Sequence, residues 1–234
     1  MNMVDSNLNA GRDKMELVYS EFINHINRGN EYRSEDLFVC GALTADKEVD
    51  ILHQIVNIMP NGNIIEIGSW MGLSTITLAL SLKERYNSNT YSVIAIDPHD
   101  KQHSMASDAT ANYFNNAPEN FDMSVEFLNN IEKWKCREYV IYHRNYSSEL
   151  DFSGQDISAI FIDGDHRKQQ VLEDLNRYVP FVKENGYIAM HDTNTNDVQE
   201  AIREFESNNF NVWENATNLF NNNNGMMEIF RKKA

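Results

Sequence analysis

The feature that most constrains the fold is a change of pattern near Asn63, where short apolar runs begin to alternate with stretches of helical periodicity. This alternation is typical of parallel strands that crossover helices cover on both faces. The predicted strands are Ile64–Ile67, Ser92–Ile96, Tyr139–His143, Ile157–Ile162 and Tyr187–Met190. The helices predicted with them are Leu73–Tyr86, Phe121–Lys133, Lys168–Val179 and Asp197–Ser207.

Both ends of the chain add elements to this pattern. Two further strands, Phe210–Glu214 and Met226–Phe230, flank the run Asn221–Asn224 and are expected to form a closing hairpin. Upstream, apolar residues at helical spacing predict helices at Met15–Ile26 and Thr44–Met59. We therefore expect an α/β fold: a Rossmann-like, doubly wound, mostly parallel seven-stranded sheet with a C-terminal antiparallel hairpin strand and N-terminal helices.

The length of 234 residues suits one such domain, so residues 1–60 are interpreted as an N-terminal helical extension and residues 61–234 as the domain itself. The net charge of −15 repels phosphate backbones, which argues against nucleic acid as a partner. No apolar stretch approaches the length of a membrane span, and a cytoplasmic location is expected. Cys40 and Cys136 are expected to be reduced, half-buried thiols.

The first predicted strand runs into the turn Glu66-Ile67-Gly68-Ser69-Trp70-Met71-Gly72, which a helix follows at once. Glycines at such a turn let the backbone approach a ligand, and the helix N-terminus offers unpaired N–H groups. A dinucleotide fingerprint would need a second glycine where Trp70 stands, so a nicotinamide dinucleotide fits poorly. A glycine-rich turn without any ligand is the alternative interpretation.

The second predicted strand ends at Asp97, followed by Pro98. A carboxylate in this position can accept both hydroxyls of a ribose, although it could equally cap a turn or helix. The polar stretch from His99 to Asn116 is a candidate lid over the site, with His99 or His103 lining it.

Polar residues also follow the fourth and fifth predicted strands, namely Asp163, Asp165 and His166 after one and His191-Asp192 after the other. Adjacent parallel strands bring them to one edge. Carboxylates suit Mg²⁺, whereas an imidazole suits Zn²⁺, Mn²⁺ or Fe²⁺ better, so Mg²⁺, another divalent cation or no metal at all stay open. A cation holding a hydroxyl would lower the pKa of that hydroxyl. Asp165 is favoured as a helix cap.

Taken together in this order, the motifs resemble those of class I S-adenosylmethionine-dependent methyltransferases. The resemblance is nearest to small-molecule O-methyltransferases of the macrocin and cephalosporin-cluster types and covers about Asn61–Thr193. The segments that carry it are Glu66–Gly72, Asp97, Phe161–His166 and Gly186–Thr193.

The resemblance implies roles for individual residues. Asp97 would bind the ribose, Asn145-Tyr146-Ser147 would touch the adenine, and His166 would act as general base with Asp163 beside it. A cation would be held by Asp163, His191 and Asp192, although His191 stands where relatives usually supply an oxygen ligand. The remaining cofactor contacts implied are Glu66, Gly68, Ser69, Trp70, Gly72, Pro98 and Asp163.

The expected reaction is methyl transfer from S-adenosylmethionine to a hydroxyl of a small molecule, such as a sugar or another natural product, and phenolic acceptors stay open. The resemblance to this family also implies a homo-oligomer. Two alternatives remain: a nicotinamide-dependent oxidoreductase on the same kind of sheet, and a protein that binds S-adenosylmethionine without catalysis.

Overall fold

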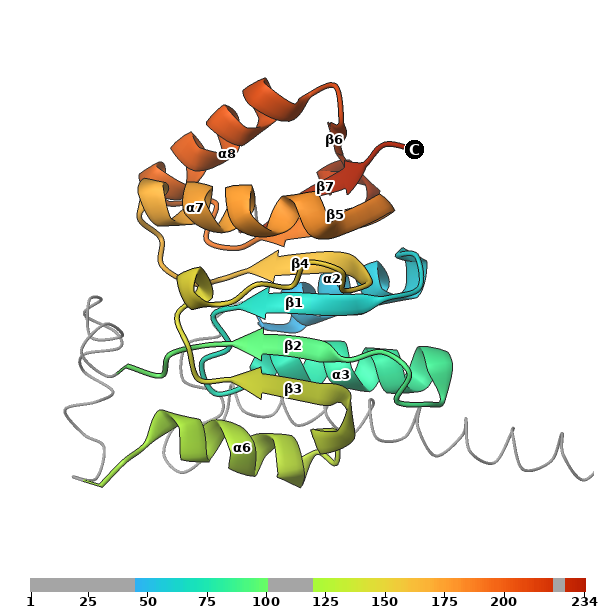
Figure 1. Cartoon of the computed structure of the whole chain (residues 1–234), viewed down its shortest axis with the longest axis vertical. Helices are drawn as coiled ribbons and strands as arrows, with labels where there is room; N and C mark the ends of the chain where they lie inside the picture. Colours follow the sequence, from blue (N-terminus) through green and yellow to red (C-terminus); the bar gives the residue numbers. More distant parts are fainter. Residues whose placement is uncertain (1–44, 101–119, 221–225) are drawn as a thin grey trace, which may run out of the picture.

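The computed structural model describes residues 45–100, 120–220 and 226–234 and contains a seven-stranded sheet with the strand order β3-β2-β1-β4-β5-β7-β6 (Figure 1). The strands β1 to β5 pair in parallel, and β7 runs antiparallel to both β5 and β6. The doubly wound sheet and its antiparallel closing strand are therefore confirmed. The strands are β1 Asn63–Ile67, β2 Val93–Ile96, β3 Val140–His143, β4 Ile157–Ile162, β5 Val182–Met190, β6 Trp213–Asn215 and β7 Glu228–Lys232.

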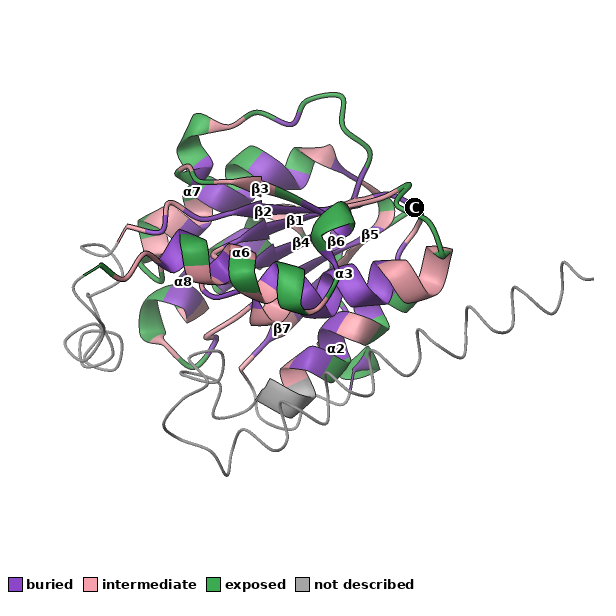
Figure 2. Cartoon of the chain, turned by 90° about the horizontal axis from the view of Figure 1, so that it is seen from below, coloured by how far each residue is buried: buried purple, intermediate pink, exposed green. Residues whose placement is uncertain are grey.

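Helices cover both faces of the sheet because successive strand residues point to opposite sides. Ile64 packs into one apolar cluster with α2, α3 and α6, whereas Ile65 packs into the other with α7 and α8. Figure 2 shows the strands buried between these layers, with the buried stripe of each helix turned inward. The helices are α2 Ala45–Ile58, α3 Leu73–Tyr86, α6 Met123–Lys133, α7 Lys168–Tyr178 and α8 Asn196–Asn209. Short 3₁₀ helices occupy η2 Arg137–Tyr139, η3 Ser147–Glu149, η4 Val179–Phe181 and η5 Thr217–Leu219.

Most predicted elements lie within a few residues of their observed bounds, and the differences have physical causes. The strand β5 begins at Val182 rather than Tyr187 because its first half is polar and only partly buried, which hides it from an apolar pattern. The hairpin strands lie nearer the C-terminus than expected, since Phe210 to Val212 form the turn before β6. The helix predicted over Met15–Ile26, the N-cap Thr44 and the Asn221–Asn224 run lie outside the described residues.

Cys136 is fully buried rather than half-buried, and this burial raises the pKa of its thiol to about 12. A thiol with such a pKa stays protonated and unreactive at neutral pH. Cys40 lies outside the described residues. Within the described ranges, no helix is both long and apolar enough to cross a membrane.

Candidate active site

The motif residues meet along one edge of the sheet because four neighbouring strands end in register. Ile67 of β1 pairs with Ile96 of β2 and with Ile162 of β4, and Ile162 pairs with Met190 of β5. The arrowheads of β1 to β4 in Figure 1 all point to this edge. The residues that follow these strand ends therefore lie side by side, as the parallel topology predicts.

The glycine turn after β1 packs closely against the end of the neighbouring strand β4. Gly68 has a φ of +85°, and a Cβ there would lie 2.1 Å from the carbonyl oxygen of Asp163. Gly72, with a φ of +94°, is the N-cap residue of α3, and its N–H donates to the Ser69 carbonyl over 2.8 Å. Trp70 adopts a left-handed φ of +43°, which is unfavourable for a residue with a side chain. At position 68, only glycine allows the turn to approach the end of β4 this closely.

Glu66 lies beneath this turn with a fully buried carboxyl group. Its Oε2 atom accepts hydrogen bonds from the hydroxyls of Ser69 and Thr75. The other oxygen, Oε1, is buried and has no hydrogen-bond partner among the described residues. Burial raises the pKa of Glu66 to about 7. A buried acceptor without a donor costs free energy, so this oxygen suits an N–H or ammonium group that a ligand would bring.

Asp97 ties the glycine turn to the end of β2. Its Oδ2 atom accepts the backbone N–H groups of Ser69 and Trp70 over 2.9 and 2.8 Å, and Oδ1 accepts that of His99 over 2.7 Å. An ionised carboxylate offers about four acceptor positions, so the backbone uses most of them. The predicted ribose contact stays a prediction, and the structure adds that Asp97 shapes the turn.

His99 is buried beneath the turn, and its predicted place along a lid stays a prediction. Its side chain is fully inaccessible, Nε2 lies 2.6 Å from the Trp70 carbonyl oxygen, and Nδ1 contacts the Tyr142 hydroxyl. Because a carbonyl only accepts, Nε2 donates to the Trp70 carbonyl oxygen. His103 and the polar stretch beyond Asp100 lie outside the described residues.

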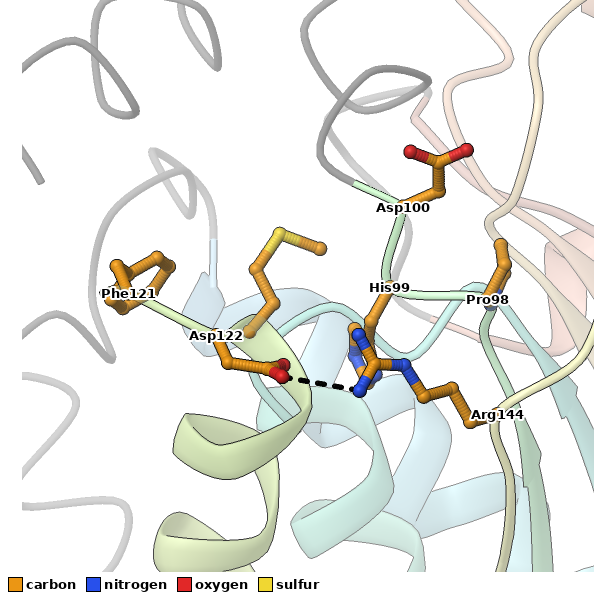
Figure 3. A pocket seen from close by; sticks show the side chains of 7 residues that line it. Pro98, His99, Asp100, Phe121, Asp122 and Arg144 are labelled. Atoms are coloured by element: carbon orange, nitrogen blue, oxygen red, sulfur yellow. Dashed lines mark hydrogen bonds and ion pairs between the residues drawn. The ribbon is translucent and has the colours of Figure 1, made fainter. Parts of the chain in front are cut away.

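A cavity of about 380 Å³ opens next to Asp97, between the end of β2 and the start of α6 (Figure 3). Arg144 reaches across it and pairs with Asp122, with Nη1 and Oδ2 3.1 Å apart. Its lining combines charged groups with apolar surface, as a polar, ring-containing ligand would require. The lining residues are Pro98, His99, Asp100, Phe121, Asp122, Met123 and Arg144.

The segment predicted to touch adenine forms a turn after β3 whose side chains point in different directions. Tyr146 is exposed and donates its hydroxyl to Asp100 on the cavity wall over 2.9 Å. The Asn145 amide donates to Glu149 over 3.1 Å. Ser147 is buried, and its hydroxyl donates to Asp174 of α7 over 2.5 Å. The Ser147 side chain therefore points into the protein interior, whereas Tyr146 contacts the cavity wall through Asp100.

Asp163, His191 and Asp192 lie together after β4 and β5. His191 Nδ1 is 3.0 Å from Asp163 Oδ1 and 3.4 Å from Asp192 Oδ2. One donor atom from each of the three residues lies within 4.8 Å of the others, close enough to share a metal ion. Burial disfavours the charged form of His191, but Asp163, Asp192 and Glu48 together outweigh this and raise the pKa of His191. The sequence thus identified three groups that the fold does bring together.

His166 adjoins the same cluster from the loop before α7. Its Nε2 lies 3.0 Å from Asp192 Oδ2 and 3.8 Å from Asp163 Oδ1. Contacts with Asp163 and Asp192 raise the pKa of His166 to about 10, so its ring carries a proton at neutral pH while both carboxylates are ionised. As the general base that the sequence predicts, His166 would first need these charges to be neutralised.

Asp165 stands apart from this cluster. It accepts the N–H of Arg167 over 2.9 Å and also binds the guanidinium of that residue. Arg167 itself occupies the N-cap position of α7. Asp165 therefore stabilises the turn before the helix rather than the cap itself, and its carboxylate is paired with a cation of the chain.

Glu48 adjoins the cluster at His191 and was missed by the sequence interpretation. It lies on α2, and its Oε1 atom is 2.9 Å from Nε2 of His191. Within an ordinary amphipathic helix nothing marks this acid as different from other polar residues. Only the packing of α2 against the sheet brings it to the strand ends.

Comparison with known proteins identifies the family. A family model described as a methyltransferase domain matches residues 65–193, which is more than half of the chain. The chain belongs to this methyltransferase family. As its motifs imply, it is an S-adenosylmethionine-dependent methyltransferase, and the match gives no support to a nicotinamide-dependent oxidoreductase. No curated protein matches its sequence.

Solved structures share the fold of the methyltransferase. The O-methyltransferase NovP is 15% identical, covers 94% of this chain and 98% of its own, and has a TM-score of 0.68. The O-methyltransferase TomG from Streptomyces achromogenes is 11% identical, with coverages of 93% and 90% and a TM-score of 0.57. An S-adenosylmethionine-dependent O-methyltransferase from Thermotoga maritima is 16% identical, with coverages of 91% and 71% and a TM-score of 0.57. At these identities the likeness concerns the architecture alone.

Proposed function

We propose that this methyltransferase transfers the methyl group of S-adenosylmethionine to a hydroxyl oxygen of a small molecule and that a divalent cation takes part. The observation that carries this proposal is the cluster of Asp163, His166, His191 and Asp192 beside the glycine turn. The hydrogen bond from the Asp163 N–H to the Ile67 carbonyl, 2.8 Å long, joins the two sites directly. A methyl donor at the turn and an acceptor at the cluster would therefore be neighbours.

The residues around the turn fit S-adenosylmethionine. The buried, unpartnered Oε1 of Glu66 suits the ammonium group of the methionine part, which would supply the missing donors. The first turn of α3 offers close backbone approach, and the cavity beyond Pro98 offers room for a ring system. When bound, the sulfonium supplies an electrophilic methyl group.

Asp163, His191 and Asp192 have donors that suit a divalent cation. The separations of 3.0 and 3.4 Å between His191 Nδ1 and the two carboxylate oxygens are close to those between neighbouring ligands of an ion with bonds of about 2.1 Å. One imidazole and two carboxylates favour Mn²⁺, Fe²⁺ or Zn²⁺ over Mg²⁺. A cation bound there would supply positive charge that lowers the pKa of a nearby hydroxyl and of His166.

His166 is our candidate for the proton acceptor. Its side chain is 45% exposed, so an acceptor molecule can reach its ring, whereas the side chain of His191 is only 13% exposed. In the proposed step the acceptor oxygen attacks the methyl carbon, the carbon–sulfur bond breaks with its electrons on sulfur, and the hydroxyl proton passes to His166. Asp163 and Asp192 orient the ring through their contacts with Nε2.

The acceptor that we propose is a small hydroxylated molecule such as a sugar or another natural product. The net charge of −15 supports this choice over nucleic acid, because it repels phosphate backbones. A cytoplasmic location and a homo-oligomeric assembly are further proposals that rest on the sequence alone.

A methyl-transfer assay tests the proposal. The full chain is incubated with S-adenosylmethionine labelled in its methyl group and with a panel of sugars and phenols, and labelled products are separated by mass. We expect a methyl ether from at least one hydroxylated acceptor, loss of turnover in excess EDTA, and recovery when Mn²⁺ is added back. Full activity in EDTA would remove the cation from the proposal. Methylation confined to amines or thiols would contradict transfer to oxygen.

A further inference from the structure

The helix α2 reaches the candidate cation site through the side chain of Glu48. Val49, Leu52, Ile55 and Val56 of α2 are buried in the apolar cluster that it shares with α3 and the sheet. This packing fixes the preceding residue, Glu48, against the end of β5. The side chains of Glu48 and His191 are only 19% and 13% exposed, so their contact is largely shielded from water.

The two nitrogens of His191 face different carboxylates. Nδ1 is 3.0 Å from Asp163 Oδ1, whereas Nε2 is 2.9 Å from Glu48 Oε1. Glu48 is not a member of the group whose donor atoms all lie within 4.8 Å of one another. It therefore contacts the opposite side of the ring and is placed to orient His191, not to share a metal ion with Asp163 and Asp192.

Glu48 can choose between two orientations of the ring that packing alone cannot distinguish. The ring of Phe161 packs on His191 in a T-shaped arrangement, with centroids 6.3 Å apart. An apolar contact of this kind restricts the ring, but it does not distinguish between the two orientations that differ by a half-turn, which exchanges the nitrogen and carbon edges of the ring. A carboxylate beside Nε2 stabilises only the orientation in which a nitrogen faces it.

We propose that Glu48 is a positioning residue that holds Nε2 of His191, so that Nδ1 faces Asp163 and Asp192, and that α2 is thereby part of the cation site. This inference rests on the proposed cation. Histidine ligands of metals commonly have their second nitrogen held by a carboxylate, and loss of such a partner weakens metal affinity by about 10- to 100-fold.

Calorimetric titration of the full chain with Mn²⁺, without S-adenosylmethionine or acceptor, tests the role of Glu48. We expect the wild type to bind about one ion, and Glu48→Gln to bind it at least about 10-fold more weakly. Asp50→Asn is the matched control because it removes the same charge from an exposed position on the same helix, and it should change the affinity less than twofold. Glu48→Ala should lose at least as much affinity as Glu48→Gln.

A double-mutant cycle separates positioning from general stabilisation of the fold. His191→Asn retains an oxygen that can bind the ion but removes the ring on which Glu48 acts, so Glu48→Gln should have no further effect on Mn²⁺ affinity in that background. An equal loss in both backgrounds would overturn the positioning role, and so would unchanged affinity in Glu48→Gln when the wild type binds Mn²⁺. No binding by the wild type would instead contradict the cation in the proposed function, and this inference with it.

Discussion

The two histidines at the strand ends differ in what surrounds them, and this difference divides their roles. His191 is largely buried and has a carboxylate near each ring nitrogen, so it is suited to a fixed position. His166 is 45% exposed and contacts its carboxylates through Nε2. Of these two histidines, His166 is therefore the one better placed to exchange a proton with a molecule that arrives from solvent.

Replacement of His166 by alanine tests this division of roles. We expect kcat to fall by about 100- to 10,000-fold, because a general base contributes this much, while the affinity for S-adenosylmethionine stays unchanged. Gln169→Ala, at an exposed position of α7, is the control and should keep wild-type kcat. Steady-state kinetics with a saturating methyl donor measures both. Wild-type turnover in His166→Ala would show that another group takes the proton.

Glu66 couples stability to pH in a direction that its burial dictates. In the folded protein its pKa is raised from 4.5 to about 7, so its contribution to stability is present in acid and is lost as the pH rises through about 7. A shift of this size corresponds to about 3 kcal/mol. Between pH 4 and pH 9, the unfolding free energy of Glu66→Gln should therefore rise by about this amount relative to wild type. Denaturant titrations across this range measure the difference, and a constant difference would contradict the buried, ionisable state of Glu66.

Apart from Glu66, which lies within β1, the site residues that the sequence identified follow strand ends, where a short motif places them on a known edge. Asp163 and Asp192 belong to this group, and the fold brings them together as expected. Glu48 and Asp174 were not identified, because each is one acid among several on an amphipathic helix. Which face of such a helix meets the site depends on packing between distant segments, and a local pattern does not contain that information.

At the scale of elements, the turn after β3 is fastened to α7 by two hydrogen bonds at a single residue. The Ser147 hydroxyl donates to Asp174, and the Tyr178 hydroxyl donates to the Ser147 carbonyl. Asp174 and Tyr178 are one helical turn apart, so they present adjacent groups to η3. Burial raises the pKa of Asp174 to about 6. Because burial disfavours the ionised carboxylate, its hydrogen bonds are needed to stabilise that form.

Removal of the Ser147 hydroxyl should loosen this connection. Ser147→Ala leaves the buried Asp174 with one donor fewer, so we expect a loss of about 1–3 kcal/mol in unfolding free energy at pH 7. The KM for S-adenosylmethionine should rise more than kcat falls, because the turn borders the cavity and not the reacting atoms. Ser148→Ala, at an exposed position of the same 3₁₀ helix, should change neither the unfolding free energy nor the KM for S-adenosylmethionine. Equal effects of the two substitutions would contradict the anchoring role.

Element prediction succeeded where burial is uniform and failed where it is mixed. Every residue of β4 is buried, and its bounds are those predicted from the apolar run. The first half of β5 contains Lys183, Glu184 and Asn185, and its pairing with β4 shifts register between Ile157 and Ala159. A polar, irregular strand segment lacks the regular pattern of apolar residues by which a strand is predicted from sequence.

At the scale of the whole molecule, the parallel sheet explains why the site is composed of residues far apart in the sequence. The turn after β1, the acid after β2 and the polar ends of β4 and β5 share one edge because these strands run in the same direction. The methyltransferase family match begins within β1 and ends three residues after β5, so it spans this edge. The cofactor and the acceptor are expected there together.

Isothermal titration of the purified full chain with S-adenosylmethionine tests the central claim most directly, with NAD⁺ as the comparison ligand. The account predicts saturable binding of about one S-adenosylmethionine per chain and no binding of NAD⁺, since Trp70 stands where a pyrophosphate would need glycine. Binding of NAD⁺, together with no detectable binding of S-adenosylmethionine at millimolar concentration, would contradict this account.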